Sequence, residues 1–492
     1  MHTPLFPSWR CFLAPLRPKL KNSLDPFARA TLAHIEQSLA PALPAGLLQK
    51  PRSGEHSRRR VFCLARTFWC WIWQLFQANT SCRQVVRQLQ AMLSLLEQAP
   101  IDEDCSAYCQ ARAKLSLDLL EKAFNGSFLS AQKLAPTSTL LQSKPIKIVD
   151  ASTVRLEDTP KNRAAFPSTQ NQFSRPGFPA LKVLALFSLA SGSLLARATG
   201  TLKVPETRLL MSLRQYIEPG DVLAGDRAYG LYVVLHWVST LGADMMARLN
   251  ARSRRVDFRQ AVKRLGPRDA LFLWTKPKVP SKLLSAEQWA QVPETMLVRI
   301  IHLRIERPGF RTRELTIVTT LINPELYPAR EIVEVYFKRW RLEMCLDDLK
   351  TTLGMEKLNC RTPTLVHKEL LVFLIAHNFI RWIMCQAAKT GAVKLERISF
   401  TGTLDGFRQW SVALVQVRGP GKLAKQKRLW RELLQTLAAD LLPERPGRQE
   451  PRAVKKRSKY PRLTKPRHSY VERWSRNKRR RVQRAKNRAS LI

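Results

Sequence analysis

The spacing of apolar residues divides the chain into a helical part, a strand-rich part and a second helical part. Residues 25–130 follow a helical period, and polar cap signals at 79–81 and 102–104 predict helices over 82–96 and 105–124. Four aromatic residues of this part, which we interpret as core contacts and not as a base-stacking platform, are Trp69, Trp71, Trp73 and Phe76. The N-terminal part is therefore predicted to be a helical unit.

From Pro145 onward the pattern changes to strands. Apolar runs predict a meander of three strands at 146–150, 180–189 and 193–199. A strand at 221–226, a helix at 231–240 and a strand at 243–249 follow. Because strands then alternate with a helix, the expected fold is a mixed α/β sheet with helices packed on it. In this prediction Asp150 and Asp226 each stand at a strand end.

Beyond residue 252 the pattern predicts a β-rich insertion and then helices. Two β-rich arms at 296–306 and 313–321 are joined by the turn signal at 307–310. A long helix follows, with apolar residues at Val335, Leu342, Leu346 and Leu349. The apolar stretch 370–384 is interrupted by polar residues and is too short to cross a membrane, so we interpret it as a buried helix.

The long helix carries a polar stripe of possible chemical importance. Tyr336, Arg339, Glu343 and Lys350 are spaced so that they share one face of a helix. A carboxylate between cationic side chains suits a metal held beside a phosphate. The alternative is a solvated face with an Arg339/Glu343 pair, and spacing does not decide whether Glu343 or Asp347 would hold a metal.

The charge of the chain indicates a polyanionic partner. Its 83 Lys and Arg against 38 Asp and Glu give a formal net charge of +45. From residue 445 to the end there are 19 Lys or Arg and 2 acids, which predicts a nonspecific DNA anchor, although a merely solvated tail is the alternative. In the helical part, Arg83, Arg87, Arg112 and Lys114 would let a helical hairpin enter a DNA groove, with helix packing as the alternative.

The nine cysteines are odd in number and lack C-x-x-C spacing, so the sequence indicates neither a zinc site nor a disulfide framework. They are typical of a reducing cytosol. The N-terminal stretch lacks a continuous apolar segment, and we do not expect it to be a signal peptide.

Three acids become more informative together than alone. Asp150 and Asp226 at strand ends, with Glu343 on a packed helix, can converge at one sheet edge. There they would repel one another unless cations lay between them. Two Mg²⁺ ions about 3.5 to 4 Å apart are a common arrangement for in-line phosphoryl displacement. Each acid alone is more often a turn or cap residue.

With these motifs the chain resembles the DDE transposases of bacterial insertion sequences of the IS-four family. The resemblance rests on IVDAST around Asp150, AGDRAYG around Asp226, and the Tyr336-x-x-Arg339-x-x-x-Glu343-x-x-x-x-x-x-Lys350 pattern. It extends from Asn79 to Asp405 and includes CSAYCQARAKL and ISFTGTL.

The resemblance implies a metal-binding triad of Asp150, Asp226 and Glu343, and so favours Glu343 over Asp347. It also implies contacts of Tyr336, Arg339 and Lys350 with transposon-end phosphates, and we expect Arg227 to bind DNA as well. Where the family often has a further acid, this chain has Ala228-Tyr229-Gly230, so the route of cleavage through a DNA hairpin stays open. In the insertion, Trp274 and Trp289 are candidates to hold a flipped base.

We therefore expect a ribonuclease-H-like mixed sheet core of α/β class with a β-rich insertion, a helical N-terminal domain and a basic C-terminal tail. The predicted domains are a helical DNA-binding region at 1–140, a core at 141–260 and 326–405, a β-strand insertion at 261–325, and a helical and basic region at 406–492.

The predicted function is cutting of DNA at insertion-sequence ends and joining of the ends to target DNA, with two Mg²⁺ ions, for which Mn²⁺ can substitute. The expected partner is double-stranded DNA, both terminal inverted repeats and target, bound by a homodimer without membrane contact. The expected location is the bacterial cytoplasm, in association with the nucleoid. The alternatives are a non-catalytic basic DNA-binding protein or decayed transposase, and a related nuclease or resolvase.

Overall fold

The structure is a computed structural model that describes residues 35–58, 60–77, 80–95, 101–167, 177–249, 256–304, 314–416 and 422–443. Within its helices, the side chains of residues 92, 95, 340–343, 412, 415 and 416 are outside the description. The predicted basic tail from residue 445 and the predicted turn at 307–310 also lie outside the described residues.

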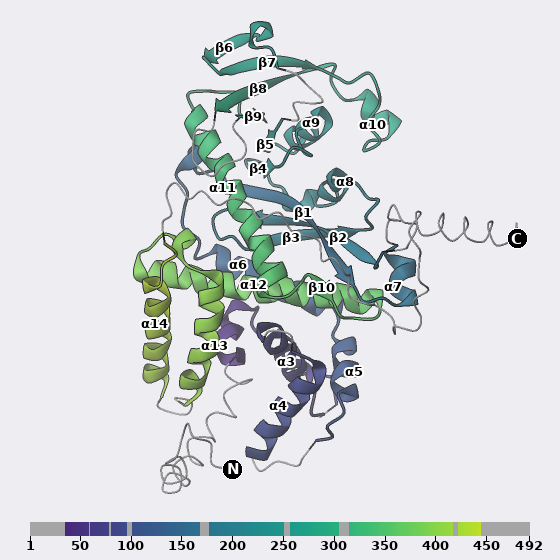
Figure 1. Cartoon of the computed structure of the whole chain (residues 1–492), viewed down its shortest axis with the longest axis vertical. Coiled ribbons are helices and arrows are strands. Elements are labelled where there is room, and N and C mark those ends of the chain that lie inside the picture. Colours follow the sequence, from purple (N-terminus) through teal and green to yellow (C-terminus); the bar gives the residue numbers. More distant parts are fainter. Residues whose placement is uncertain are drawn as a thin grey trace, which may run out of the picture. The chain divides into compact units, whose positions relative to one another are not determined.

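A ten-stranded mixed sheet forms the centre of the described chain (Figure 1). Nine strands lie in the order β3-β2-β1-β4-β5-β9-β8-β7-β6, and β10 pairs with β1. The strands β1, β2 and β3 form an antiparallel meander, and β4 and β5 continue the sheet parallel to β1. The strands are β1 Ile146–Leu156, β2 Ala180–Ser188, β3 Leu194–Gly200, β4 Val222–Gly225, β5 Asp244–Arg248, β6 Lys263–Gly266, β7 Asp269–Thr275, β8 Thr295–Arg304, β9 Glu314–Thr319 and β10 Lys357–Leu358.

The predicted mixed α/β fold is confirmed, but the first strand is longer than expected. β1 continues to Leu156, so Asp150 lies within the strand and not at its end. The sequence hid this because residues 150–153 are polar or small, while the apolar alternation resumes at Val154 and Leu156, which are buried. The prediction that Asp150 ends a strand is therefore wrong.

The strands after residue 260 do not form a separate sheet. β9 pairs antiparallel with β5, and β8, β7 and β6 extend the sheet from there. The sequence analysis found only the two arms that became β8 and β9. The proposed domain boundaries stay predictions.

Helices cover both faces of the sheet. They are α3 Leu64–Phe76, α4 Cys82–Leu95, α5 Ser106–Lys114, α6 Leu117–Gln132, α7 Pro160–Ala165, α8 Glu206–Met211, α9 Tyr232–Thr240, α10 Ala286–Ala290, α11 Ala329–Asp347, α12 Pro363–Gly391, α13 Phe400–Gln416 and α14 Leu423–Ala439. One hydrophobic core joins one face to α11, α12 and the N-terminal helices, and the other joins the opposite face to α8 and α9. The central strands thus alternate their side chains between two cores, as Ile148 and Val149 of β1 do.

The N-terminal helices show one confirmed and one wrong prediction. Trp69, Trp71 and Phe76 are each 1% exposed, as expected of core residues. The single helix predicted over 105–124 is instead two helices, α5 and α6. They separate at Ser116, which caps α6 by accepting a hydrogen bond from the backbone N–H of Leu119 at 3.1 Å.

The long helix α12 is a core helix. By length and composition it could cross a membrane, but 89% of its most apolar window is buried. Its central Asn378 is fully buried, and its side chain pairs with the backbone N–H and C=O of Leu194 at 2.8 and 3.0 Å. The prediction of a buried helix is confirmed, although its 29 residues exceed the predicted length.

Candidate active site

The two aspartates of the predicted triad occupy equivalent positions on neighbouring strands. Ile146 is in register with Val222, and the parallel pairing of β1 with β4 ends at Ile148 and Ala224. Asp150 and Asp226 follow those last partners by two residues each, so both side chains project from the same face. They stand where the pairing of β1 with β4 ends.

Short hydrogen bonds hold both carboxylates in place. One oxygen of Asp226 accepts the backbone N–H of Ala228 at 2.7 Å, which forms a turn directly after β4. One oxygen of Asp150 accepts the N–H of Ala151 at 2.8 Å. Both aspartates are partly exposed, so a ligand can reach their carboxylates from solvent.

The two glycines that flank this turn have a packing role. A Cβ atom on Gly225 would lie 2.7 Å from the Cδ2 atom of Tyr229, and one on Gly230 would lie 2.8 Å from the carbonyl oxygen of Arg248. Tyr229 is fully buried, and burial raises the pKa of its phenol, with the charges of Glu206, Asp226 and Asp150 adding to the shift. Tyr229 is therefore a buried residue of this turn whose pKa responds to the charges of both aspartates.

Helix α11 brings the predicted polar stripe to this face. It contacts β1, β4 and β5, and Ile332, Val335 and Tyr336 belong to the core on the side of Asp150 and Asp226. Figure 1 shows α11 running in front of these strands. Burial raises the pKa of the Tyr336 phenol, while Arg339 opposes this shift and Asp226 adds to it. Tyr336 thus lies in the electrostatic neighbourhood of both Arg339 and Asp226.

The open phosphate-binding stripe that the sequence predicts is only partly observed. Tyr336 is 1% and Arg339 is 7% exposed, so both are covered by protein. The Arg339 guanidinium carbon lies 5.5 Å from the centre of the Tyr336 ring. Arg227 is exposed and Lys350 is half-buried. Glu343 lies on α11, but its side chain is outside the described part of the chain.

Lys350 does not continue the α-helix of the stripe. α11 ends at Asp347, and residues Asp348–Thr352 form a π-helix. A π-helix has more residues per turn than an α-helix, so spacing counted on an α-helix misplaces Lys350. The expectation of one continuous α-helical stripe is therefore wrong at its last member.

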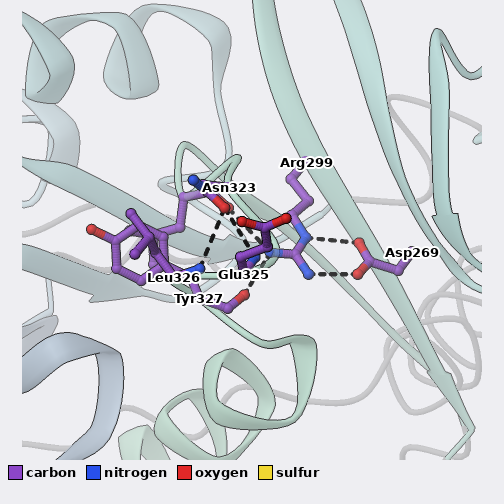
Figure 2. A network of polar contacts seen from close by, with 7 residues as sticks. Asp269, Arg299, Asn323, Glu325, Leu326 and Tyr327 are labelled. Carbon is purple, nitrogen blue, oxygen red and sulfur yellow. Dashed lines mark hydrogen bonds and ion pairs between the residues drawn. The ribbon is translucent and has the colours of Figure 1, made fainter.

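A buried network fixes the segment that leads into α11 (Figure 2). Arg299 of β8, which is 1% exposed, binds both carboxylate oxygens of Asp269 at 2.8 and 2.5 Å. It also donates to the backbone carbonyl of Tyr327 at 2.7 Å. Asn323 accepts the N–H of Glu325 at 2.9 Å in the same segment. The charge-assisted bidentate pair therefore holds Arg299 within the sheet, and its bond to the Tyr327 carbonyl connects the sheet to the start of α11.

The aromatic candidates of the predicted insertion differ in exposure. Trp274 of β7 is 6% exposed and belongs to the core with α9. Trp289 is partly buried, with the Lys276 ammonium 5.1 Å from its ring centre. Their suggested role with a flipped base stays a prediction.

Sequence reasoning missed a polar cluster at the end of α11. The possible ligand atoms of Cys345, Asp348 and His377 lie within 4.8 Å of one another. Burial raises the pKa of Asp348 to about 7 and lowers that of His377 to about 3. The signal in the sequence was weak, because Asp347 and Asp348 are adjacent and only one of them is turned inward.

We expect Asp348 to make stability depend on pH. Because its folded pKa is raised from 3.8 to about 7, its proton stabilises the folded state at low pH, and this contribution is lost as pH rises through that window. Asp348→Asn should therefore gain about 3 kcal/mol of stability relative to wild type when the pH is raised from 5 to 8. Urea unfolding at both pH values measures the difference.

The exposed neighbour supplies the control for that measurement. Asp347→Asn should change the pH dependence much less than Asp348→Asn, because the charge of Asp347 is the smallest of the three causes that set the pKa of Asp348. The pKa of His377 is lowered, so its titration makes stability rise with pH, opposite to that of Asp348. All the proteins compared contain His377, so its contribution cancels in the difference. Equal pH dependence in wild type and Asp348→Asn would contradict the assignment.

Comparison with known proteins agrees with this geometry. Residues 141–379 match the family described as Transposase DDE domain. The transposase InsG for insertion sequence element IS4 of Escherichia coli is 26% identical over 414 residues, which cover 82% of this chain and 88% of that protein. A solved structure of the piggyBac transposase synaptic complex with hairpin DNA has a TM-score of 0.38 at 10% identity, covering 86% of this chain and 85% of that chain, and at this score it supports no argument.

The matched region begins before β1 and ends within α12, so it contains Asp150, Asp226 and the whole of α11. DDE transposases act on DNA and use divalent metal ions. These two matches support the assignment of this chain to the DDE transposases of the IS-four (IS4) family.

Proposed function

We propose that this transposase cuts DNA at the ends of an insertion sequence and joins them to target DNA by Mg²⁺-dependent phosphoryl transfer. The observation that carries the proposal is the placement of Asp150 and Asp226, in register on one sheet face beneath α11. The proposed substrates are the terminal inverted repeats and the target duplex. The proposed working form is a homodimer on DNA, in the bacterial cytoplasm at the nucleoid.

The strand order supports a ribonuclease-H-like core within the larger sheet. An antiparallel meander of β1, β2 and β3 is followed by β4 and β5, which run parallel to β1, in the order β3-β2-β1-β4-β5. In this proposal β6 to β9 are an insertion that continues the core sheet before α11 returns to it.

The donor set fits hard divalent cations. Asp150 and Asp226 offer carboxylate oxygens, the ligand type that Mg²⁺ prefers. We propose that they hold two Mg²⁺ ions together with Glu343, and that Mn²⁺ can substitute. The chemistry that Mg²⁺ supplies in such sites is stabilisation of the attacking and departing oxygens.

The surrounding side chains divide into two groups by exposure. Arg227 and Lys350 reach solvent, and we propose that they bind phosphates of the transposon end. Tyr336 and Arg339 are buried, Arg339 lies on the Tyr336 ring, and the pKa of Tyr336 responds to the charge of Asp226. We propose that the two residues help to position that carboxylate. Contact of these two residues with phosphate would require the covering protein to move.

The proposed function is tested by cleavage of the inverted repeats that flank the gene. Purified full-length protein is incubated with end-labelled duplexes, with Mg²⁺ or with chelator, and with a scrambled duplex as control. Cleavage at the repeat end and later joining to a target plasmid are expected only with Mg²⁺. Binding without any Mg²⁺- or Mn²⁺-dependent cleavage would contradict the proposal.

The tail from residue 445 is proposed to anchor DNA without sequence preference. Deleting residues 445–492, with a local charge of +17 from 19 basic and 2 acidic residues, should weaken binding to all duplexes alike. For each phosphate that the shortened protein no longer binds, the slope of log affinity against log salt should fall by about 0.9. Salt titrations on end and random duplexes measure this, and unchanged slopes would contradict the anchor role.

A further inference from the structure

Cys82 occupies an electropositive position in the N-terminal helices. It is the first residue of α4, where backbone N–H groups favour a negative charge. Its sulfur accepts hydrogen bonds from Arg112 Nη1 at 3.1 Å and from Gln74 Nε2 at 3.8 Å. Cysteines at helix starts and beside arginine favour the thiolate form.

Burial and further contacts hold Arg112 against Cys82. It is only 8% exposed, and its guanidinium carbon lies 3.9 Å from the centre of the Trp71 ring. Its other terminal nitrogen, Nη2, donates to Cys360 Sγ at 3.4 Å. The prediction that Arg112 enters a DNA groove is therefore wrong, because α5 turns it into the protein. A buried guanidinium requires negative charge nearby, and a Cys82 thiolate provides it.

Cys109 of α5 is the second member of the cluster. It lies three residues before Arg112 on α5, a helix that contacts α4, so its side chain is on the same side of α5 as Arg112. Cys109 is exposed, whereas Cys82 is partly buried. Interaction with Cys109, followed by Arg112 and Gln74, lowers the pKa of Cys82 to about 6, against the effect of burial. The same interaction raises the pKa of Cys109.

The phenol and the second thiol around Arg112 do not replace the thiolate, whereas the carboxylate of Glu369 adds to it. Tyr108 is fully buried and donates its hydroxyl to Gln74 at 3.0 Å, and burial raises the pKa of its phenol. Burial also raises the pKa of Cys360, so this thiol stays protonated. Glu369 accepts the backbone N–H of Cys360 at 2.9 Å and adds a second negative charge.

We propose that Cys82 and Cys109 form a peroxide-sensitive thiol pair that closes to a disulfide between α4 and α5. The Cys82 thiolate attacks one oxygen of hydrogen peroxide, which breaks the O–O bond and gives a sulfenic acid and hydroxide. The Cys109 sulfur then attacks the Cys82 sulfur, its proton leaves with the hydroxyl as water, and the S–S bond forms. Two thiols lose two electrons in all, and peroxide takes them up.

Closing the pair would change the surroundings of Arg112. The disulfide is neutral, so the buried guanidinium loses the thiolate that it binds at 3.1 Å. The same bond ties the start of α4 to α5. This inference rests on the cluster alone and stands apart from the proposed DNA cleavage.

The first test needs no substitution. Reduced full-length protein is alkylated with iodoacetamide from pH 5 to 9, and each cysteine is followed by mass spectrometry. Cys82 should react with a midpoint near pH 6, and at pH 7 about tenfold faster than Cys105, a partly buried cysteine at the N-cap of α5, which controls for a position at a helix start. Equal rates at pH 7 would overturn the proposal.

The second test follows oxidation. Stoichiometric hydrogen peroxide should give a Cys82–Cys109 linked peptide as the main disulfide, and Cys105→Ser should not change it. Cys109→Ser keeps a hydroxyl donor, so Cys82 should stop at the sulfenic acid and be captured by dimedone. In Cys82→Ser, Cys109 should lose its reactivity toward peroxide. A main disulfide between other cysteines, or an uncaptured Cys82 in Cys109→Ser, would refute the pair.

Discussion

Asp226→Asn should abolish DNA cleavage and leave binding to the transposon end intact. The change removes one ligand charge from the proposed metal site but keeps an oxygen that can accept the Ala228 N–H, now at 2.7 Å, so the turn after β4 should persist. A loss of about a thousandfold in cleavage rate corresponds to about 4 kcal/mol in the barrier. Single-turnover cleavage and gel-shift binding on the same end duplex measure the two quantities.

A surface substitution of the same type controls for the loss of one negative charge. Asp118→Asn on α6 removes a carboxylate that pairs with Lys122 at 2.8 Å in solvent, and it should cleave at the wild-type rate. Circular dichroism and thermal unfolding of Asp226→Asn should match the wild type. If Asp226→Asn kept Mg²⁺-dependent cleavage, the metal-ligand role of Asp226 would be wrong.

Local patterns in the sequence were sufficient for the elements that carry the acids. The short run before Asp226 became β4, and the following apolar period became α9, because each is buried and bounded by turn residues. The position of Asp150 within β1 was not predictable in this way. The middle of β1, just beyond its pairing with β4, consists of polar or small residues. The alternation of apolar and polar positions that marks a strand is therefore interrupted at the candidate site itself.

Long-range contacts account for most of what the sequence did not reveal. Arg112 and Lys114 look alike in a basic helix, yet Arg112 packs on Trp71 from α3, while Lys114 pairs with Glu55 at 2.8 Å near the surface. Similarly, nothing in the sequence distinguishes Arg299 from other arginines, and its role follows only from its contact with Asp269 of β7. Spacing within one element cannot identify partners from other elements, and these partners decide whether a cation faces DNA or the core.

The choice between two acids on α11 gives the second large expected effect. Glu343→Gln should reduce cleavage by about a thousandfold, whereas Asp347→Asn should stay within about threefold of wild type. Both acids have similar helical angles relative to Tyr336, about 20° to either side, so angle alone does not separate them. Asp347 lies about 6 Å farther along the axis.

The contacts of Asp347 support this difference. It is exposed at the last turn of α11, and its Oδ1 accepts a hydrogen bond from Thr351 Oγ1 at 2.7 Å. Its carboxylate is therefore occupied at the junction with the π-helix. Single-turnover cleavage with both variants, at matched DNA occupancy, decides the question. Equal loss in the two would mean that α11 presents its last turn, and not Glu343, to the aspartates of β1 and β4.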